Sequence, residues 1–372
     1  MQRVKYLKLK ILIVSCLFLS PNVFALMAYN TIEGLGIESM MGGVGLARLG
    51  SNGALGSNPA LLAWLPKQHE FISSNSINYY KLASQSGGDI NVVPDVVPRL
   101  AASTEGFGNW GHSYGLIINK MKVTVDQTLD GTRALGTSEM QAINLNYGFG
   151  SKISEGLSLG LSLNLGHYQD EGNFSSVGES DGFEFAYAIQ SKKSFFNQGV
   201  SLGVASEFET WSLGAAAKFN TSLFGASYSS EITGYTEVTN SNSTQTDHRK
   251  DPIKVIPIYG LGVQKKFDHL RSFFDLNYTQ SHTDIDSGEY EKSSLGGALG
   301  LEGALSEAYR WYSGFAYTLS NLSDEGAAGK ASFGFSKRGP HSLNFAGLSW
   351  TRTLKSAESQ LIVLNFGTKF DY

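Results

Sequence analysis

One short motif has the residue types and spacing of a nucleophilic enzyme. The stretch Gly111–Gly115 fits the Gly-x-Ser-x-Gly pattern, in which hydrolases expose a serine on a strained strand-to-helix turn. Here the motif opens an alternating stretch that continues through Leu116, so His112 and Tyr114 should point away from Ser113. We therefore expect an ordinary strand at this position, and we predict that the protein is not an enzyme.

A second cluster has the start of a metal-binding pattern. Asp284, Asp286 and Glu289 surround Gly288 with the carboxylate spacing that opens a calcium loop. The third ligand position and the distal glutamate are missing, so a solvated loop is the better interpretation. The seven histidines are scattered without ligand spacing. We predict no metal site and no cofactor.

Composition narrows the classes of partner and of membrane span. The formal charge is −4, and without the four cations of the first 25 residues it is 25 − 33 = −8. This balance disfavours nucleic acid as a partner. No apolar run after those residues is long enough for a transmembrane helix. Only a closed β-barrel could then cross a bilayer, because it pairs every backbone group between strands.

The N-terminus has the pattern of a secretory signal peptide. The four cations Arg3, Lys5, Lys8 and Lys10 come first, and an apolar stretch over 11–19 follows them. Val23-Phe24-Ala25 then provides small residues at positions 23 and 25. We predict a signal peptide over residues 1–25. Cys16, the only cysteine, would leave with it. An alternative stays open, since Ile13-Val14-Ser15-Cys16 loosely resembles a lipoprotein box in which Cys16 carries lipid.

Period-2 alternation recurs along most of the chain and predicts strands. In 156–168, leucines at odd positions face Ser, Gly and Asn at even ones, which suits lipid on one side and a polar interior on the other. We predict an all-β fold, a transmembrane antiparallel β-barrel over 68–372. The alternating segments number about fifteen, whereas such a barrel requires an even number. Placing 199–208 in an external loop over 169–210 gives about 14 strands, and making 181–192 a strand gives 16. We predict fourteen.

The last residues resemble the closing strand of bacterial outer-membrane barrels. Asn365, Gly367, Phe370 and Tyr372 alternate along a strand that finishes on an aromatic residue. The resemblance implies an insertion signal at Gly367, Phe370 and Tyr372 that the barrel-assembly machinery reads. It also implies the bacterial outer membrane as the location, with lipid and lipopolysaccharide as surroundings.

Residues 26–67 differ from the barrel and are rich in glycine. Asn58 is a good helix N-cap, Pro59 suits the first helical position, and Pro66 ends the run, so a short apolar helix is expected between them. The Met, Leu and Trp side chains of this segment need burial. The lumen of a barrel too wide to be filled by its own side chains provides it.

Two blocks of this segment, 41–47 and 57–63, resemble the hatch of the outer-membrane long-chain fatty acid and aromatic-hydrocarbon transport family. The resemblance implies a hatch plugging the lumen, and passive uptake of small hydrophobic molecules such as long-chain fatty acids or hydrocarbons. It places gating at Asn58, Pro59, Ala60, Gly42 and Gly43, by hatch movement or by a kink in the wall. The alternative is a structural barrel or an assembly or secretion partner that transports no small molecule.

Overall fold

The computed structural model describes residues 36–83, 89–91, 95–129, 132–180, 183–236, 241–249, 257–285, 288–320, 327–353 and 360–371. The predicted signal peptide, Cys16 and Tyr372 lie outside these residues. Within them, no helix is long and apolar enough to cross a membrane.

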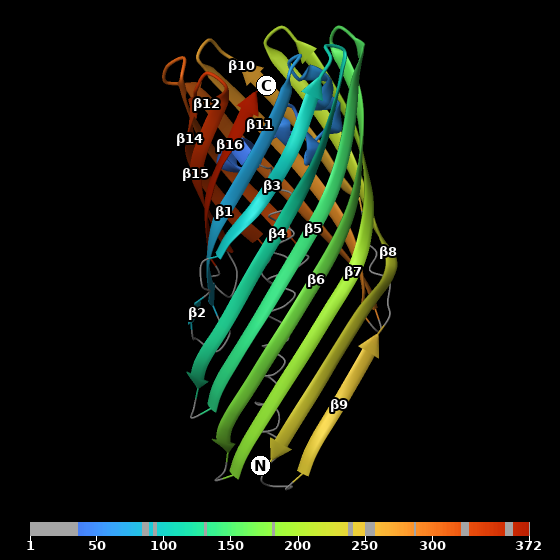
Figure 1. The fold of residues 1–372 in the computed structure, drawn as a ribbon, viewed down its shortest axis with the longest axis vertical. Coiled ribbons are helices and arrows are strands. Elements are labelled where there is room, and N and C mark those ends of the chain that lie inside the picture. The colour runs from blue at the N-terminus through green and yellow to red at the C-terminus, as the bar shows by residue number, and fades with distance from the viewer. Residues whose placement is uncertain are drawn as a thin grey trace.

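Sixteen strands form one antiparallel sheet that closes on itself (Figure 1). The strands are β1 (His69–Ala83), β2 (Asp89–Asn91), β3 (Asp95–Gly106), β4 (Trp110–Leu129), β5 (Thr132–Ser154), β6 (Leu157–Ser180), β7 (Phe183–Phe208), β8 (Trp211–Thr236), β9 (Ser241–Arg249), β10 (Ile258–Lys266), β11 (Leu270–Ile285), β12 (Gly288–Ala304), β13 (Tyr309–Ser320), β14 (Ala327–Arg338), β15 (Ser342–Thr353) and β16 (Gln360–Asp371). Within the described residues, strands β2 and β9 each pair with one neighbour only. The closed circuit therefore has 16 − 2 = 14 strands, which confirms the predicted barrel and its strand number.

The last strand closes the barrel against the first. Strand β16 pairs with β1 along its whole length, from Glu70 opposite Asp371 to Lys81 opposite Gln360. On its other side β16 pairs with β15. The alternating C-terminal strand predicted from the sequence is thus a full member of the wall.

The outer face of the wall is apolar and the inner face polar. On β6, Leu159, Leu161, Leu163 and Leu165 are exposed, whereas Ser162 is buried on the inner side. This is the reverse of a water-soluble protein, and it is the arrangement of a barrel whose outer face contacts lipid. The one-sided leucine pattern in the sequence is therefore confirmed as an outward-facing band.

Strands β4 to β8 are much longer than the rest of the wall. They have 20 to 26 residues, against 9 to 17 for the other strands of the circuit. Crossing a bilayer takes about 9–11 residues. The long strands extend past their neighbours at the end opposite the C-terminus (Figure 1). The other end of the barrel, where the C-terminus lies, has the short connections 107–109, 155–156 and 209–210 between strands. We call it the turn end.

The reasoning that led to fourteen strands was wrong in its details. The predicted external loop 169–210 is mostly strand, and 199–208 and 181–192 both contribute to β7. Two of the about fifteen alternating segments, 211–220 and 223–237, are not separate strands, because β8 runs from Trp211 to Thr236. Its pairing with β7 shifts register beside Phe196. Such a shift interrupts the alternation, so one irregular strand looked like two regular ones.

Candidate functional site

Three short 3-10 helices precede the first strand: η1 (Gly36–Met41), η2 (Asn52–Leu55) and η3 (Pro59–Trp64). The predicted helix after Asn58 is confirmed as η3. The Asn58 side chain caps it by accepting a hydrogen bond of 3.1 Å from the Ala60 N–H, and Pro59 occupies the first helical position. Gly42 and Gly43 follow η1 with φ of 75° and 91°, a region that favours glycine. They reverse the chain direction there.

Residues 36–68, the lumenal segment, lie inside the barrel near the turn end (Figure 1). The first helix packs on β12 to β16, and the third packs on β3 to β7. The segment therefore bridges opposite sectors of the wall. Its apolar residues Met40, Met41, Val44, Leu61 and Leu62 are almost fully buried. They join inward side chains of the wall in two apolar clusters.

Polar side chains of the wall hold the backbone of the lumenal segment. Asp275 on β11 accepts hydrogen bonds from the N–H groups of Gly45, at 2.7 Å, and Leu46, at 3.0 Å. Ser332 on β14 accepts one from Gly42 N–H at 2.8 Å. On the opposite side, the Asn58 side-chain amide donates to the Val204 carbonyl on β7 at 2.9 Å. The segment is thus attached around much of the wall.

Glycines on the inner wall allow this close approach. A Cβ on Gly214 would lie 1.8 Å from the Leu46 oxygen, and one on Gly314 would lie 2.0 Å from the Met41 carbonyl carbon. A Cβ on Gly160 would lie 2.3 Å from the Pro59 carbonyl carbon. No real side chain fits at such distances, so backbone contacts backbone at several strands.

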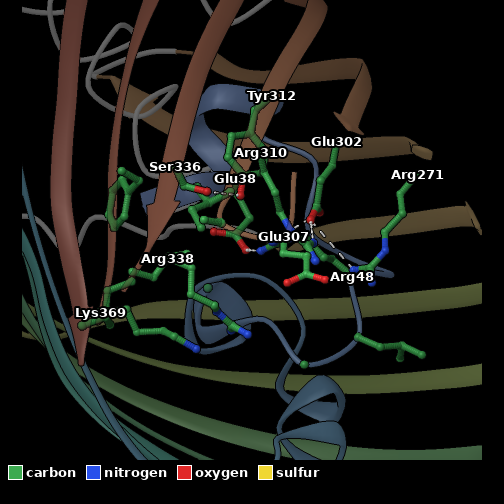
Figure 2. A pocket seen from close by; sticks show the side chains of 18 residues that line it. Glu38, Arg48, Arg271, Glu302, Glu307, Arg310, Tyr312, Ser336, Arg338 and Lys369 are labelled. Atoms are coloured by element: carbon green, nitrogen blue, oxygen red, sulfur yellow. Dashed lines mark hydrogen bonds and ion pairs between the residues drawn. The ribbon is translucent and has the colours of Figure 1, made fainter. Parts of the chain in front are cut away.

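A buried charge cluster joins the lumenal segment to β12 and β13 (Figure 2). Arg48 pairs with Glu38 of its own segment at 2.7 Å and reaches Glu302 on the wall at 3.4 Å. Arg310 also pairs with Glu302, and Arg271 approaches the same carboxylate at 4.0 Å. Burial alone would lower the pKa of the Arg48 guanidinium, but Glu302 and Glu38 outweigh it and the pKa is raised. Arg48 therefore stays charged.

A cavity of about 250 Å³ lies beside this cluster, between the lumenal segment and the wall. Charged groups share its lining with the apolar residues Ile37, Ile72, Leu343 and Phe345. The cavity is smaller than the ~300–1,000 Å³ of typical ligand pockets. It is also lined by the exposed turn residue Glu307, so it lies at the turn end of the barrel.

The wall is incompletely paired between β3 and β4. Their ladder covers only seven pairs, from Gly106 opposite Gly111 to Leu100 opposite Ile117. Beyond it β3 continues to Asp95 and β4 to Leu129, without pairing to each other. We call this place the β3–β4 seam. Seven pairs span ~23 Å along a strand, or ~18 Å across the membrane at a tilt of ~40°. The pairing therefore ends within a hydrocarbon core of ~30 Å.

Local sequence explains why the ladder stops. Pro98 has no N–H to donate, and the β1–β3 register shifts at the same place, from Ser74 opposite Leu100 to Asn75 opposite Pro98. The buried Val97 and Leu100 on β3 make the inner side of the seam apolar. Val97 and Leu100 thus place apolar side chains on the inner side of an incompletely paired part of the wall.

The sequence-predicted site residues separate into two groups. Asn58, Pro59 and Ala60 are buried against β6 and β7, and Gly42 and Gly43 lie across the lumen beside β13 and β14. Gly367 and Phe370 belong to β16 instead, with Phe370 exposed on the outer face. A Cβ on Gly367 would meet Ser73 and Phe345, which belong to the wall and not to the lumenal segment.

The two sequence motifs that resembled enzyme or metal sites lie in strands. Ser113 is fully buried on β4 and its hydroxyl donates to the Ser103 carbonyl at 3.1 Å. Tyr114 is exposed on the other face. Asp284 and Glu289 pair across β11 and β12, while 286–287 lie outside the described residues. Within the described part of the chain, no three His, Cys, Asp or Glu side chains are grouped as metal ligands would be.

Sequence reasoning missed Asp275, Glu302 and Arg48. Each wall carboxylate stands alone in an alternating strand, so no local motif marks it. Asp275 lies between the outward-facing Phe274 and Leu276, which places it on the inner face. An isolated acid at an inward position was the available signal.

Comparison with solved structures identifies the fold. The chain is similar to a monoaromatic hydrocarbon channel, CymD, at 14% identity and a TM-score of 0.72, covering 92% of this chain and 98% of the other. It is similar to the toluene transporter TodX of P. putida at 15% identity and 0.70, covering 91% and 98%. A Pseudomonas aeruginosa FadL homologue follows at 13% and 0.63, covering 89% and 96%.

No family model matches the chain, and no curated protein sequence does. The fold is shared with a monoaromatic hydrocarbon channel, a toluene transporter and a FadL homologue, so the resemblance stated from the sequence is confirmed at the level of fold. A closed barrel with this apolar outer band is a protein of the bacterial outer membrane.

Proposed function

We propose that this barrel takes up small hydrophobic molecules passively across the outer membrane and releases them sideways through the β3–β4 seam. The supporting observation is the seam itself, where β3 and β4 stop pairing with each other beyond Leu100 and Ile117, with Val97 and Leu100 on its inner side. Burial of apolar surface, worth roughly 25 cal/mol per Å², would draw an apolar solute to it from the lumen. No energy source is needed for transfer from the seam into lipid.

In this proposal the lumenal segment acts as the hatch. It overlaps the predicted hatch 26–67 from residue 36 onward and contacts the wall. Its attachment at Asp275, Ser332 and Val204 favours the seam over the axis as the exit. The gating role of Asn58, Pro59, Ala60, Gly42 and Gly43 is part of the proposal. They are attachment or turning points whose release would open the axial route.

The remaining assignments also belong to the proposal. Residues 1–25 would direct export, and the β16 residues Gly367 and Phe370, with Tyr372, would be read by the barrel-assembly machinery. Outer-membrane lipid and lipopolysaccharide would surround the barrel. The similar structures are a hydrocarbon channel and toluene transporters, which fits a protein without enzymatic activity.

Uptake of labelled toluene and a labelled long-chain fatty acid by whole cells tests the proposal. A strain lacking the protein should take up at least one solute more slowly than its parent. Val97→Asp, which places a charge in the seam, should fail to restore uptake. Thr351→Asp is the matched control, because it places the same charge at a buried position on β15, three strands from β3.

Equal uptake by the deletion strain and its parent for every apolar solute would exclude the proposed function. Co-purification of a stable protein partner in that case would favour a structural or secretion role. If Val97→Asp and Thr351→Asp restore uptake equally, transport stands but the seam is not the exit.

A further inference from the structure

Three polar side chains beside the seam are buried without a hydrogen-bond partner. Ser76 is 0% exposed, Asn119 2% and Asn78 3%. Among the described residues, neither the Ser76 hydroxyl nor either end of the two carboxamides meets a partner. Buried polar groups are nearly always satisfied, so five unpaired atoms in one region of the wall require an explanation.

Strand register places these groups on β1 and β4, the two strands on either side of β3. Ser76 pairs with Val97 of β3, and Asn78 is the next inward residue on β1, opposite Asp95. Asn119 is the next inward residue of β4 after Ile117, where the ladder with β3 ends. The three side chains thus flank the part of β3 that has left β4, at the level of the apolar Val97.

Other buried polar side chains, among them Thr104, Ser212 and Gln264, also have one unpaired atom, but among the described residues only Asn78 and Asn119 leave both atoms of a carboxamide unpaired. The amide of Asn146 on β5, one strand away, donates to the Asn144 carbonyl at 3.2 Å. Ser158 on β6 donates to the Ala60 carbonyl at 3.0 Å. A polar wall facing the lumen does not by itself leave a whole carboxamide unpaired.

We propose that Ser76, Asn78 and Asn119 form a recognition site for the hydroxyl group of a hydrophobic alcohol or phenol. This inference rests on the proposed transport function and names its substrate class. A carboxamide offers both a donor and an acceptor, so a hydroxyl can accept from Nδ2 and donate to Oδ1. The adjacent apolar surface of Val97 and Leu100 holds the hydrocarbon part.

A plain hydrocarbon fits this place worse than its hydroxylated counterpart. It would cover the two carboxamides and the serine while leaving all their polar atoms unpaired, and such burial is costly. Sites built to hydrogen-bond a hydroxyl reject the analogue that lacks it more strongly than apolar pockets reject one extra methylene. The protein should therefore prefer the hydroxylated solute.

Toluene and p-cresol, which differ by one ring hydroxyl, give the test. We expect protein-dependent uptake of p-cresol to exceed that of toluene, and Asn119→Leu and Asn78→Leu to lower p-cresol uptake about tenfold without lowering toluene uptake. Asn146→Leu is the matched control and should leave the ratio of the two rates unchanged. Asn119→Ser and Asn78→Ser provide smaller changes if a leucine variant fails to fold.

Binding on the purified barrel in lipid nanodiscs separates the two proposals. Saturation-transfer NMR should show p-cresol binding that Asn78→Leu and Asn119→Leu weaken. If uptake of both solutes is independent of the protein, the transport proposal fails, and the binding experiment still decides the site. An unchanged p-cresol-to-toluene ratio and unchanged binding in the variants would mean that the amides hold only water, and would overturn the site.

Discussion

At the scale of single residues, Asp275 carries the clearest attachment of the lumenal segment. It is 2% exposed, and its Oδ2 accepts from both Gly45 and Leu46. Asp275→Leu should leave two buried N–H groups unpaired, each costing about 1–3 kcal/mol. We expect faster hydrogen exchange in 43–47, measured by mass spectrometry. Asp275→Asn keeps an acceptor oxygen, so its exchange rate should lie between those of the original protein and of Asp275→Leu. Exchange rates equal to that of the original protein in both variants would contradict this role.

Glu302 and Glu307 form a matched pair for the charge cluster. Both line the same cavity, but Glu302 is buried among three arginines, whereas Glu307 is exposed and has no ion pair within the described residues. Because Arg48 stays charged, Glu302→Gln would leave it short of a partner, and local opening of the lumenal segment should become easier by roughly 3 kcal/mol. Limited proteolysis of the segment measures this. Glu307→Gln should behave like the original protein, and equal sensitivity of both variants would contradict the prediction.

The contrast between these acids explains what sequence could predict at this scale. The local roles of Asn58 and Pro59 can be predicted from the sequence, because a helix N-cap and a proline at the first helical position are defined by neighbours in sequence. Asp275 and Glu302 act on residues more than 200 positions away. Their partners are brought near only by barrel closure, so no spacing within the chain could pair them.

At the scale of elements, the glycines of the wall should control how closely the lumenal segment fits. A Cβ on Gly214 of β8 would lie 1.8 Å from the Leu46 oxygen, whereas nothing lies within 4 Å of one on Gly329 of β14. Gly214→Ala should displace the segment and raise its hydrogen exchange. Gly329→Ala makes the same change in open space and should leave exchange unaltered. A normal exchange pattern in Gly214→Ala would show that the wall relaxes around the methyl group.

Strand existence was readable from sequence, but strand length was not. Alternation is strong where one face meets lipid, as in the leucines of β6, and weak where a strand has water on both sides. The distal parts of β6 and β7 are of the second kind, so the sequence predicts an external loop over 169–210 where the structure has strand. The requirement for an even number of strands led to the right strand number, but it could not show which two alternating segments belong to one strand.

At the scale of the whole molecule, barrel closure and lumen closure are separate properties. Every strand of the circuit pairs with two neighbours, and β16 meets β1 directly, so no wall hydrogen bond depends on residues 36–68 as a partner strand. Barrels of about eight strands are filled by their own side chains, and those of 16–18 leave an aqueous channel. With fourteen strands, this lumen should need the segment to be closed.

Deletion of 36–67 should therefore leave a folded barrel that conducts ions. Inward residues such as Ser74, Asn146, Ser162 and Ser349 are polar and would line a water-filled lumen once the segment is gone. Folding is checked by the mobility of unheated samples in gel electrophoresis, and conduction by recordings in planar bilayers. The full-length protein is the control and should stay closed. A deletion variant that folds but carries no current would mean that the wall itself closes the lumen, and the hatch assignment of this segment would have to be withdrawn.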